Sequence, residues 1–123
     1  MAKFLGLEDV EKAAQRNPES FFIPSLRERK GQRVGDSVRL HFLLREPGAG
    51  EPRAERMWVT VTRACGLLSG YRGRLENQPL HLEDLAVGDE IDFRPCHIAR
   101  VTVGRDDPMW IDSAEKKALV SAM

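Results

Sequence analysis

Net charge, long apolar runs and a targeting segment are all missing from this sequence. Its 19 basic residues balance 19 acidic ones, so no long-range field draws the chain to nucleic acid or to an anionic membrane. No stretch approaches the roughly twenty apolar residues of a membrane helix. Glu8, Asp9 and Glu11 lie near the start with no apolar run behind them, which argues against a signal peptide. We therefore expect a cytoplasmic protein with no membrane contact.

Cysteine is scarce, because Cys65 and Cys96 are the two in the chain. Without a secretion signal, two reduced thiols are favoured over a disulfide. A chain of 123 residues buries enough apolar surface to form one core without a disulfide or a metal ion. We expect residues 1–123 to form a single domain.

Helical patterns lie near both ends of the chain. Leu7, Val10 and Ala14 recur at helical spacing, and this pattern ends before Pro18. A capping-box pattern followed by an amphipathic run predicts a C-terminal helix that begins near Asp112. These two helices would flank the strands between them.

A shorter helical signal follows the first helix. Ser25 and Glu28 have the spacing of a capping box, which predicts a helical turn at 26–30 that stops at Gly31. Residues 82–85 are also compatible with a helical turn.

The middle of the chain alternates apolar and polar residues with the period of two that is typical of half-buried strands. Four such segments lie at 38–44, 57–61, 71–75 and 91–93, and a further short strand or turn is expected near 98–103. The sequence thus predicts an α+β fold, a small twisted antiparallel sheet of four to five strands with an N-terminal and a C-terminal helix. The expected core residues are Val38, Leu40, Phe42, Val59, Val61, Leu75, Ile91 and Phe93.

One short motif occurs twice, as Val34-Gly35-Asp36 and as Val87-Gly88-Asp89, each time directly before a strand. Glycine accepts the positive φ of a tight turn, and the aspartate can accept a hydrogen bond from the backbone N–H two residues further along the chain. If the turns converged, the two aspartates would form a carboxylate pair, but two independent turns are the favoured interpretation. Similar signals recur in small twisted sheets and SH3-like barrels.

Catalytic and cofactor motifs are also missing, since the chain has no metal-binding histidine or cysteine spacing, phosphate loop or nucleophile elbow. We therefore expect no enzyme activity, no catalytic residue, no metal and no cofactor. One enzymatic alternative stays open, a small hydrolase or transferase that uses Cys65 together with His81 or His97.

Aromatic and basic residues concentrate on two of the expected strands. Tryptophan and tyrosine flanked by arginine are typical of recognition surfaces, although both rings would be core residues if a second layer covered them. A further alternative is single-strand nucleic-acid binding by Trp58, Tyr71, Arg72 and Arg74, which the zero net charge disfavours. The expected interaction surface consists of Arg56, Trp58, Tyr71, Arg74 and Asn77.

The order of several motifs is similar to that of the YegJ-like bacterial domain family, over about residues 19–100. The family has no known function, so the resemblance implies a compact α+β fold and supplies no catalytic residue, cofactor or substrate. The motifs that carry it are Arg56-Met57-Trp58-Val59, Tyr71-x-Gly73-x-Leu75-x-Asn77-x-Pro79, Gly88-Asp89-x-Ile91-x-Phe93 and His97-Ile98.

Residues 117–121 look like the opening of a bacterial domain class linked to immunity proteins of toxin systems. This second resemblance implies that the chain is the N-terminal part of a longer protein, or that it ends where a partner domain would begin. Together these features favour a non-enzymatic interaction or regulatory domain, of an immunity type if the second resemblance holds. Its expected partner is another protein, and the sequence gives no oligomeric state.

Overall fold

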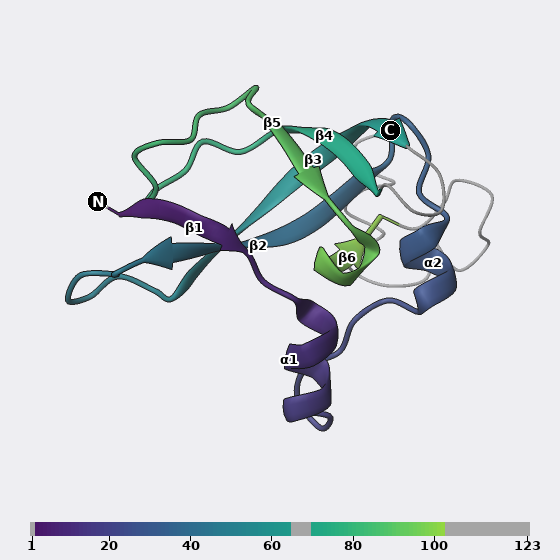
Figure 1. The fold of residues 1–123 in the computed structure, drawn as a ribbon, viewed down its shortest axis with the longest axis horizontal. Coiled ribbons are helices and arrows are strands. Elements are labelled where there is room, and N and C mark those ends of the chain that lie inside the picture. Colours follow the sequence, from purple (N-terminus) through teal and green to yellow (C-terminus); the bar gives the residue numbers. More distant parts are fainter. Residues whose placement is uncertain (1, 65–69, 103–123) are drawn as a thin grey trace, which may run out of the picture.

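A strongly curved antiparallel sheet dominates the computed structural model, which describes residues 2–64 and 70–102 (Figure 1). Two short helices lie beside this sheet. In chain order the elements are β1 (Lys3–Leu7), α1 (Val10–Arg16), α2 (Leu26–Lys30), β2 (Ser37–Arg45), β3 (Ala54–Ala64), β4 (Tyr71–Leu75), β5 (Glu90–Phe93), the single 3₁₀ turn η1 (Pro95–His97) and β6 (Ile98–Val101).

Strands β2 to β5 form a meander, and β6 returns to pair with β2, the first strand of that meander. Strands β2, β3, β4 and β5 pair with their neighbours in sequence order, and all pairs are antiparallel. Pro95 cannot donate a backbone hydrogen bond, and the chain turns there through η1 before it continues as β6. Strand β6 then pairs with β2, so that the sheet is nearly closed.

Strand β2 therefore has two partners along one edge. Strand β6 pairs with its first half, from Val38 to Leu40, and β1 pairs with its second half, from Phe42 to Arg45. The start of β1 also meets the segment that leads into β5, through a parallel bridge between Ala2 and Leu82. The sheet is thus nearly closed at two places, by this bridge near the start of β1 and by the pairing of β6 with β2.

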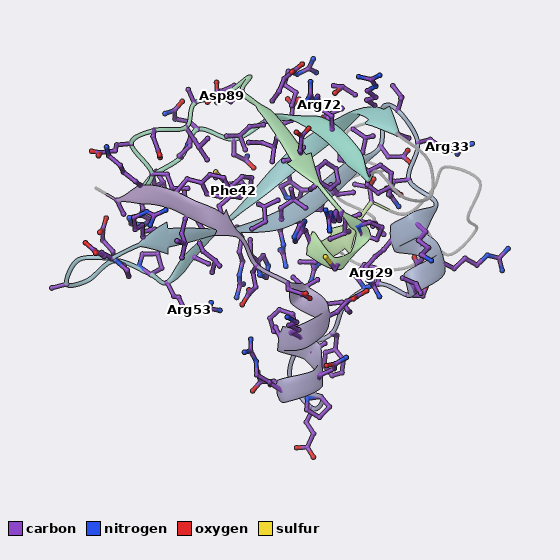
Figure 2. The ribbon with its side chains drawn as sticks, viewed as in Figure 1. Arg29, Arg33, Phe42, Arg53, Arg72 and Asp89 are labelled. Atoms are coloured by element: carbon purple, nitrogen blue, oxygen red, sulfur yellow. The ribbon has the colours of Figure 1, made fainter. Side chains whose placement is uncertain are left out.

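All eight residues predicted for the core are buried, with exposed fractions between 0% and 6%. Phe42 lies inside the molecule, whereas Arg33 and Arg53 lie at its margin (Figure 2). Gly73 lies opposite Val61, where a Cβ atom would stand only 2.3 Å from a Val59 methyl group. The absence of a side chain at this position lets β3 and β4 pack over the same core.

Arg29 joins both helices to η1. Its side chain is buried and donates hydrogen bonds to the carbonyl oxygens of Pro24 (2.9 Å) and Pro95 (3.2 Å), and it pairs with Glu11. The guanidinium group has enough donors to serve all three partners at once. One buried arginine thus fixes how α1 and α2 sit against the end of the sheet.

The repeated motif forms two equivalent turns, as predicted. Gly35 has φ 95° and Gly88 has φ 94°. The carboxylate of Asp36 accepts the Arg33 N–H (2.7 Å), and that of Asp89 accepts the Ala86 N–H (2.9 Å). Each aspartate thus closes its own turn by reaching three residues back, whereas the sequence interpretation had it reaching forward along the chain.

Each turn also docks on a strand of the meander. Gly35 and Asp36 exchange backbone hydrogen bonds with Val61, and Gly88 and Asp89 do the same with Leu75, all at 2.8–2.9 Å. The duplicated sequence signal therefore corresponds to a duplicated structural unit. The local bonds of Asp36 and Asp89 support two turn roles.

The N-terminal region differs from the prediction. Residues 3–7 form β1, so Leu7 belongs to a strand, and α1 begins at Val10 with Asp9 as its N-cap. The local pattern did not reveal the unpaired edge of β2, which recruits this segment into the sheet. The described sheet accordingly has six strands, where four to five were expected.

Two other helix predictions have different outcomes. The turn at 26–30 is confirmed, with the capping box between Ser25 and Glu28 and an end at Gly31. Residues 82–85 form no helix, because Leu82 pairs with Ala2. The predicted C-terminal helix lies outside the described residues.

Candidate functional site

The outer face of the sheet carries a tryptophan among arginines. Alternate residues of β3 share a face, so Arg56 and Trp58 point away from the side that buries Met57 and Val59. Trp58 lies directly opposite Arg39 on β2, and Arg39 lies opposite Arg100 on β6. Arg74 of β4 faces Thr60, the next outward residue of β3. We name this surface the Trp58 face, made up of Arg39, Arg56, Trp58, Arg74 and Arg100.

The Trp58 face is accessible to solvent. Arg56, Arg74 and Arg100 are exposed, and Trp58 and Arg39 are half-buried. Arg74 pairs with Glu76 at 3.0 Å, which balances one of the positive charges. The surface thus combines a large aromatic side chain with several guanidinium groups.

Asn77 holds the backbone beneath this surface. Its Oδ1 accepts the Trp58 N–H at 2.6 Å, and the Glu76 N–H donates to the Trp58 carbonyl oxygen at 3.0 Å. Both backbone groups of Trp58 are therefore held from the end of β4. Asn77 positions the tryptophan without itself being a large contact surface.

Tyr71 is placed apart from the other four predicted surface residues. It alternates with the inward residues Gly73 and Leu75, is only 6% exposed, and stacks on Phe93 with ring centroids 5.3 Å apart. Its hydroxyl donates to the Arg29 carbonyl oxygen at 2.8 Å and accepts the Gln32 N–H at 3.3 Å. Burial raises the pKa of this phenol. The tyrosine anchors α2 to the core and does not contribute to the Trp58 face.

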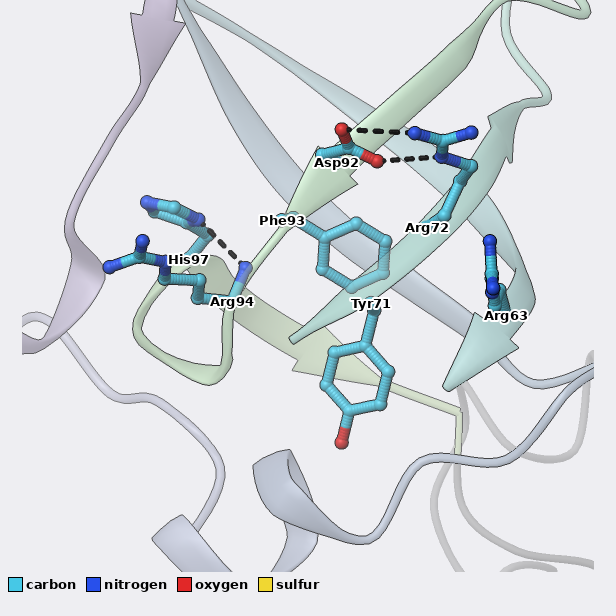
Figure 3. Close-up of a pocket in the computed structure, with 7 residues that line it drawn as sticks. All are labelled: Arg63, Tyr71, Arg72, Asp92, Phe93, Arg94 and His97. Atoms are coloured by element: carbon cyan, nitrogen blue, oxygen red, sulfur yellow. Dashed lines mark hydrogen bonds and ion pairs between the residues drawn. The ribbon is translucent and has the colours of Figure 1, made fainter. Parts of the chain in front are cut away.

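A pocket of about 330 Å³ lies where β3 ends, β4 begins and β5 leads into η1 (Figure 3). Its volume is at the lower end of the roughly 300–1,000 Å³ of small-molecule sites. Tyr71 and Phe93 contribute their stacked rings. The polar residues that line the pocket are Arg63, Arg72, Asp92, Arg94 and His97.

Hydrogen bonds inside the pocket decide its electrostatic character. Arg72 binds both carboxylate oxygens of Asp92, at 2.7 and 3.3 Å, and these bonds lower the pKa of Asp92. The Arg94 backbone N–H donates to Nδ1 of His97 at 3.0 Å. Burial lowers the pKa of His97, which favours the neutral ring. Because Nδ1 accepts, the proton of the neutral ring lies on Nε2.

A buried polar cluster around His41, which lies opposite Arg56 in the sheet, was not foreseen from the sequence. His41 and Glu8 are each 5% exposed, and Nδ1 of His41 lies 3.0 Å from the Glu8 carboxylate, which Arg53 also contacts at 2.7 Å. Burial lowers the pKa of His41 despite the nearby carboxylate. Burial acts to raise the pKa of Glu8, but the bonds from Arg53 and His41 outweigh it and lower the pKa. The strand alternation had placed His41 outward, and no local pattern links residues 33 positions apart.

The structure describes both histidines of the enzymatic alternative, but it does not describe the proposed nucleophile. Cys96 is a half-buried free thiol whose pKa is raised, first by burial and then by Asp9 and Glu11. Cys65, the proposed nucleophile, lies outside the described residues. His81 lies 3.8 Å from a carboxylate oxygen of Glu51, and His97 belongs to the pocket.

Over residues 2–64 and 70–102, no group of three or more histidine, cysteine or acidic side chains is placed to hold a metal ion. No helix in the same part of the chain has the length and apolar character to cross a membrane.

Comparison with known proteins gives no relative for this chain. No protein-family model matches it, and no curated protein or solved structure is significantly similar. The resemblance to the YegJ-like family therefore stays a prediction, and function has to be argued from the geometry.

Proposed function

We propose that this chain is a non-enzymatic binding domain that recognises another protein through the Trp58 face. The observation that carries the proposal is the position of Trp58, half-exposed in the middle of the sheet with arginines on neighbouring strands. Tryptophan and arginine are the residues most enriched among those that dominate binding energy at interfaces.

The backbone of Trp58 supports this role, because its N–H and its carbonyl oxygen are both hydrogen-bonded to residues that directly follow β4. A rigid aromatic side chain loses little conformational entropy on binding. Arg56 extends beyond it and makes no hydrogen bond or ion pair with any other described side chain, so its donors are available to a partner. The available donors of Arg56 favour a partner surface with acidic side chains.

The test compares binding by variants that leave the core intact. Wild-type protein, Trp58→Ala, Arg56→Ala and the control Phe22→Ala would each be used to capture partners from nuclease-treated extract of the source cells. Phe22 is a matched control because it is an exposed aromatic residue, at 79%, outside the sheet.

We expect one defined protein to be retained by wild type and by Phe22→Ala, and lost with Trp58→Ala and Arg56→Ala. With the purified partner, Trp58→Ala should weaken binding by about 2 kcal/mol or more, roughly 30-fold, and leave the melting temperature nearly unchanged. Equal retention by all variants would contradict the proposal. A complex that forms in a parallel untreated extract and is absent from the nuclease-treated one would instead favour the nucleic-acid alternative.

A further inference from the structure

The pocket at the start of β4 presents hydrogen-bond donors that have no partner in the part of the chain that the structure describes. Arg63 and the guanidinium of Arg94 have no hydrogen-bond or ion-pair partner among the described residues. The neutral His97 ring offers its Nε2–H, because Nδ1 is occupied by the Arg94 backbone. The acidic residue in the lining, Asp92, is paired with Arg72, which also contacts Glu90 at 3.4 Å.

Positive charge stands at both ends of the pocket. Figure 3 shows Arg63 and Arg72 on one side of the Phe93 ring, and Arg94 and His97 on the other. Two guanidinium groups so arranged do not converge on one small anion. They match an extended ligand that carries negative charges along its length.

The burial of the Tyr71 and Phe93 rings decides whether the extended anion is a single-stranded nucleic acid or an acidic peptide. Single-stranded nucleic acid gains much of its affinity by stacking bases on exposed aromatic faces. Here Tyr71 is 6% exposed and Phe93 is 2% exposed, so neither ring offers a stacking face.

We propose that this pocket binds an acidic peptide segment, with one carboxylate on Arg63 and another on Arg94 and His97. The site is separate from the Trp58 face. The inference rests on the proposed function only in that the segment would belong to a protein partner. The chemistry of the pocket does not depend on the identity of that partner.

The experiment uses defined probes, so that it does not need the natural partner. A short capped peptide of alternating glutamate and glycine is titrated into ¹⁵N-labelled protein at constant ionic strength. A peptide of the same length with glutamine in place of glutamate and an oligothymidylate of equal charge are titrated in parallel. The variants are Arg63→Gln and Arg94→Gln, and the control is Arg45→Gln, an exposed arginine on β2 outside the pocket.

We expect saturable shifts of the backbone signals of Arg63, Arg94 and His97 with the glutamate peptide and none with the glutamine peptide. Each pocket variant should weaken binding about fivefold, and Arg45→Gln should leave it unchanged. A long-range ¹H–¹⁵N spectrum should show the His97 proton on Nε2. Tighter binding of the oligothymidylate, equal weakening by the control variant or the absence of saturation would overturn the proposal. Because Trp58→Ala leaves the pocket intact, failure of one proposal does not decide the other.

Discussion

Gly35 and Gly88 hold the same left-handed backbone conformation, with φ values of 95° and 94°, in two turns that dock on Val61 and Leu75. No atom lies within 4 Å of the position that a Cβ would occupy at either glycine. Glycine is therefore required at both positions by the backbone conformation, since space for a side chain is available.

Alanine at either glycine should destabilise the fold by about 1–2 kcal/mol, the usual strain of a left-handed L-residue. Asparagine tolerates this conformation better, so Gly35→Asn and Gly88→Asn should cost less than the alanine variants. Urea denaturation of the four variants measures the difference. If alanine and asparagine cost the same, the strain argument is wrong.

Phenylalanine truncation should have opposite results inside and outside the core. Phe42 and Phe93 are 0% and 2% exposed, so alanine at either position should cost about 3–5 kcal/mol. Phe22 is 79% exposed, and its alanine variant should change the unfolding free energy by about 0.5 kcal/mol or less. A cost below about 1 kcal/mol at both core positions would mean that the strand registers are wrong.

Tyr71 is the single tyrosine of the chain, which makes its ionisation directly visible in the ultraviolet spectrum. Burial raises its pKa above the ordinary 10.0, so the folded protein should titrate at a higher pH than the urea-unfolded chain. The unfolded phenol ionises first, and stability should therefore fall as the pH rises above about 10. A folded-state titration that coincides with the unfolded one would place the phenol in solvent.

Acidification should destabilise the protein through the buried Glu8–His41 pair. The pKa of His41 lies below its ordinary 6.5, so the unfolded chain takes up the proton more readily and stability falls as the pH drops through that value. Glu8 adds a further loss below its ordinary 4.5, because its folded pKa is lowered. His97 contributes in the same direction as His41.

His41→Gln isolates the contribution of His41. The variant should lose less stability than wild type between about pH 7 and pH 5.5, and His97→Gln gives the matched comparison. Urea titrations at both pH values give the loss of unfolding free energy for wild type and for each variant, and these losses are then compared. Parallel losses in wild type and His41→Gln would show that the pair does not control acid stability.

Local sequence patterns were sufficient for much of the fold. Alternation identified the inward registers of β2 to β5, and the capping box placed α2, because both depend on neighbours within a few residues. Strand β1 was missed because it exists through pairing with β2, a contact distant in sequence.

The candidate sites show the same division. The alternation that puts Trp58 outward puts Tyr71 inward, so the two aromatic residues lie on different faces of the sheet. Arginines neighbour both residues in the sequence, and this composition alone did not separate them. The pocket brings together the ends of three strands and η1, and its character depends on hydrogen bonds such as that from Arg72 to Asp92. Side-chain bonds of this kind are set by tertiary structure and leave no periodic signal in the sequence.

The return of β6 to β2 also has a kinetic consequence. Thr102 hydrogen bonds to the Ser37 carbonyl oxygen across 65 positions of the chain, so this edge of β2 has no β6 partner until the last described residues arrive. Folds dominated by such distant pairings pass the folding barrier in milliseconds to seconds, far more slowly than helical bundles. During that interval β2 presents open backbone groups, which are templates for pairing with a second chain. Synthesis of this protein thus carries a period of exposure to misassembly that ends when β6 pairs with β2.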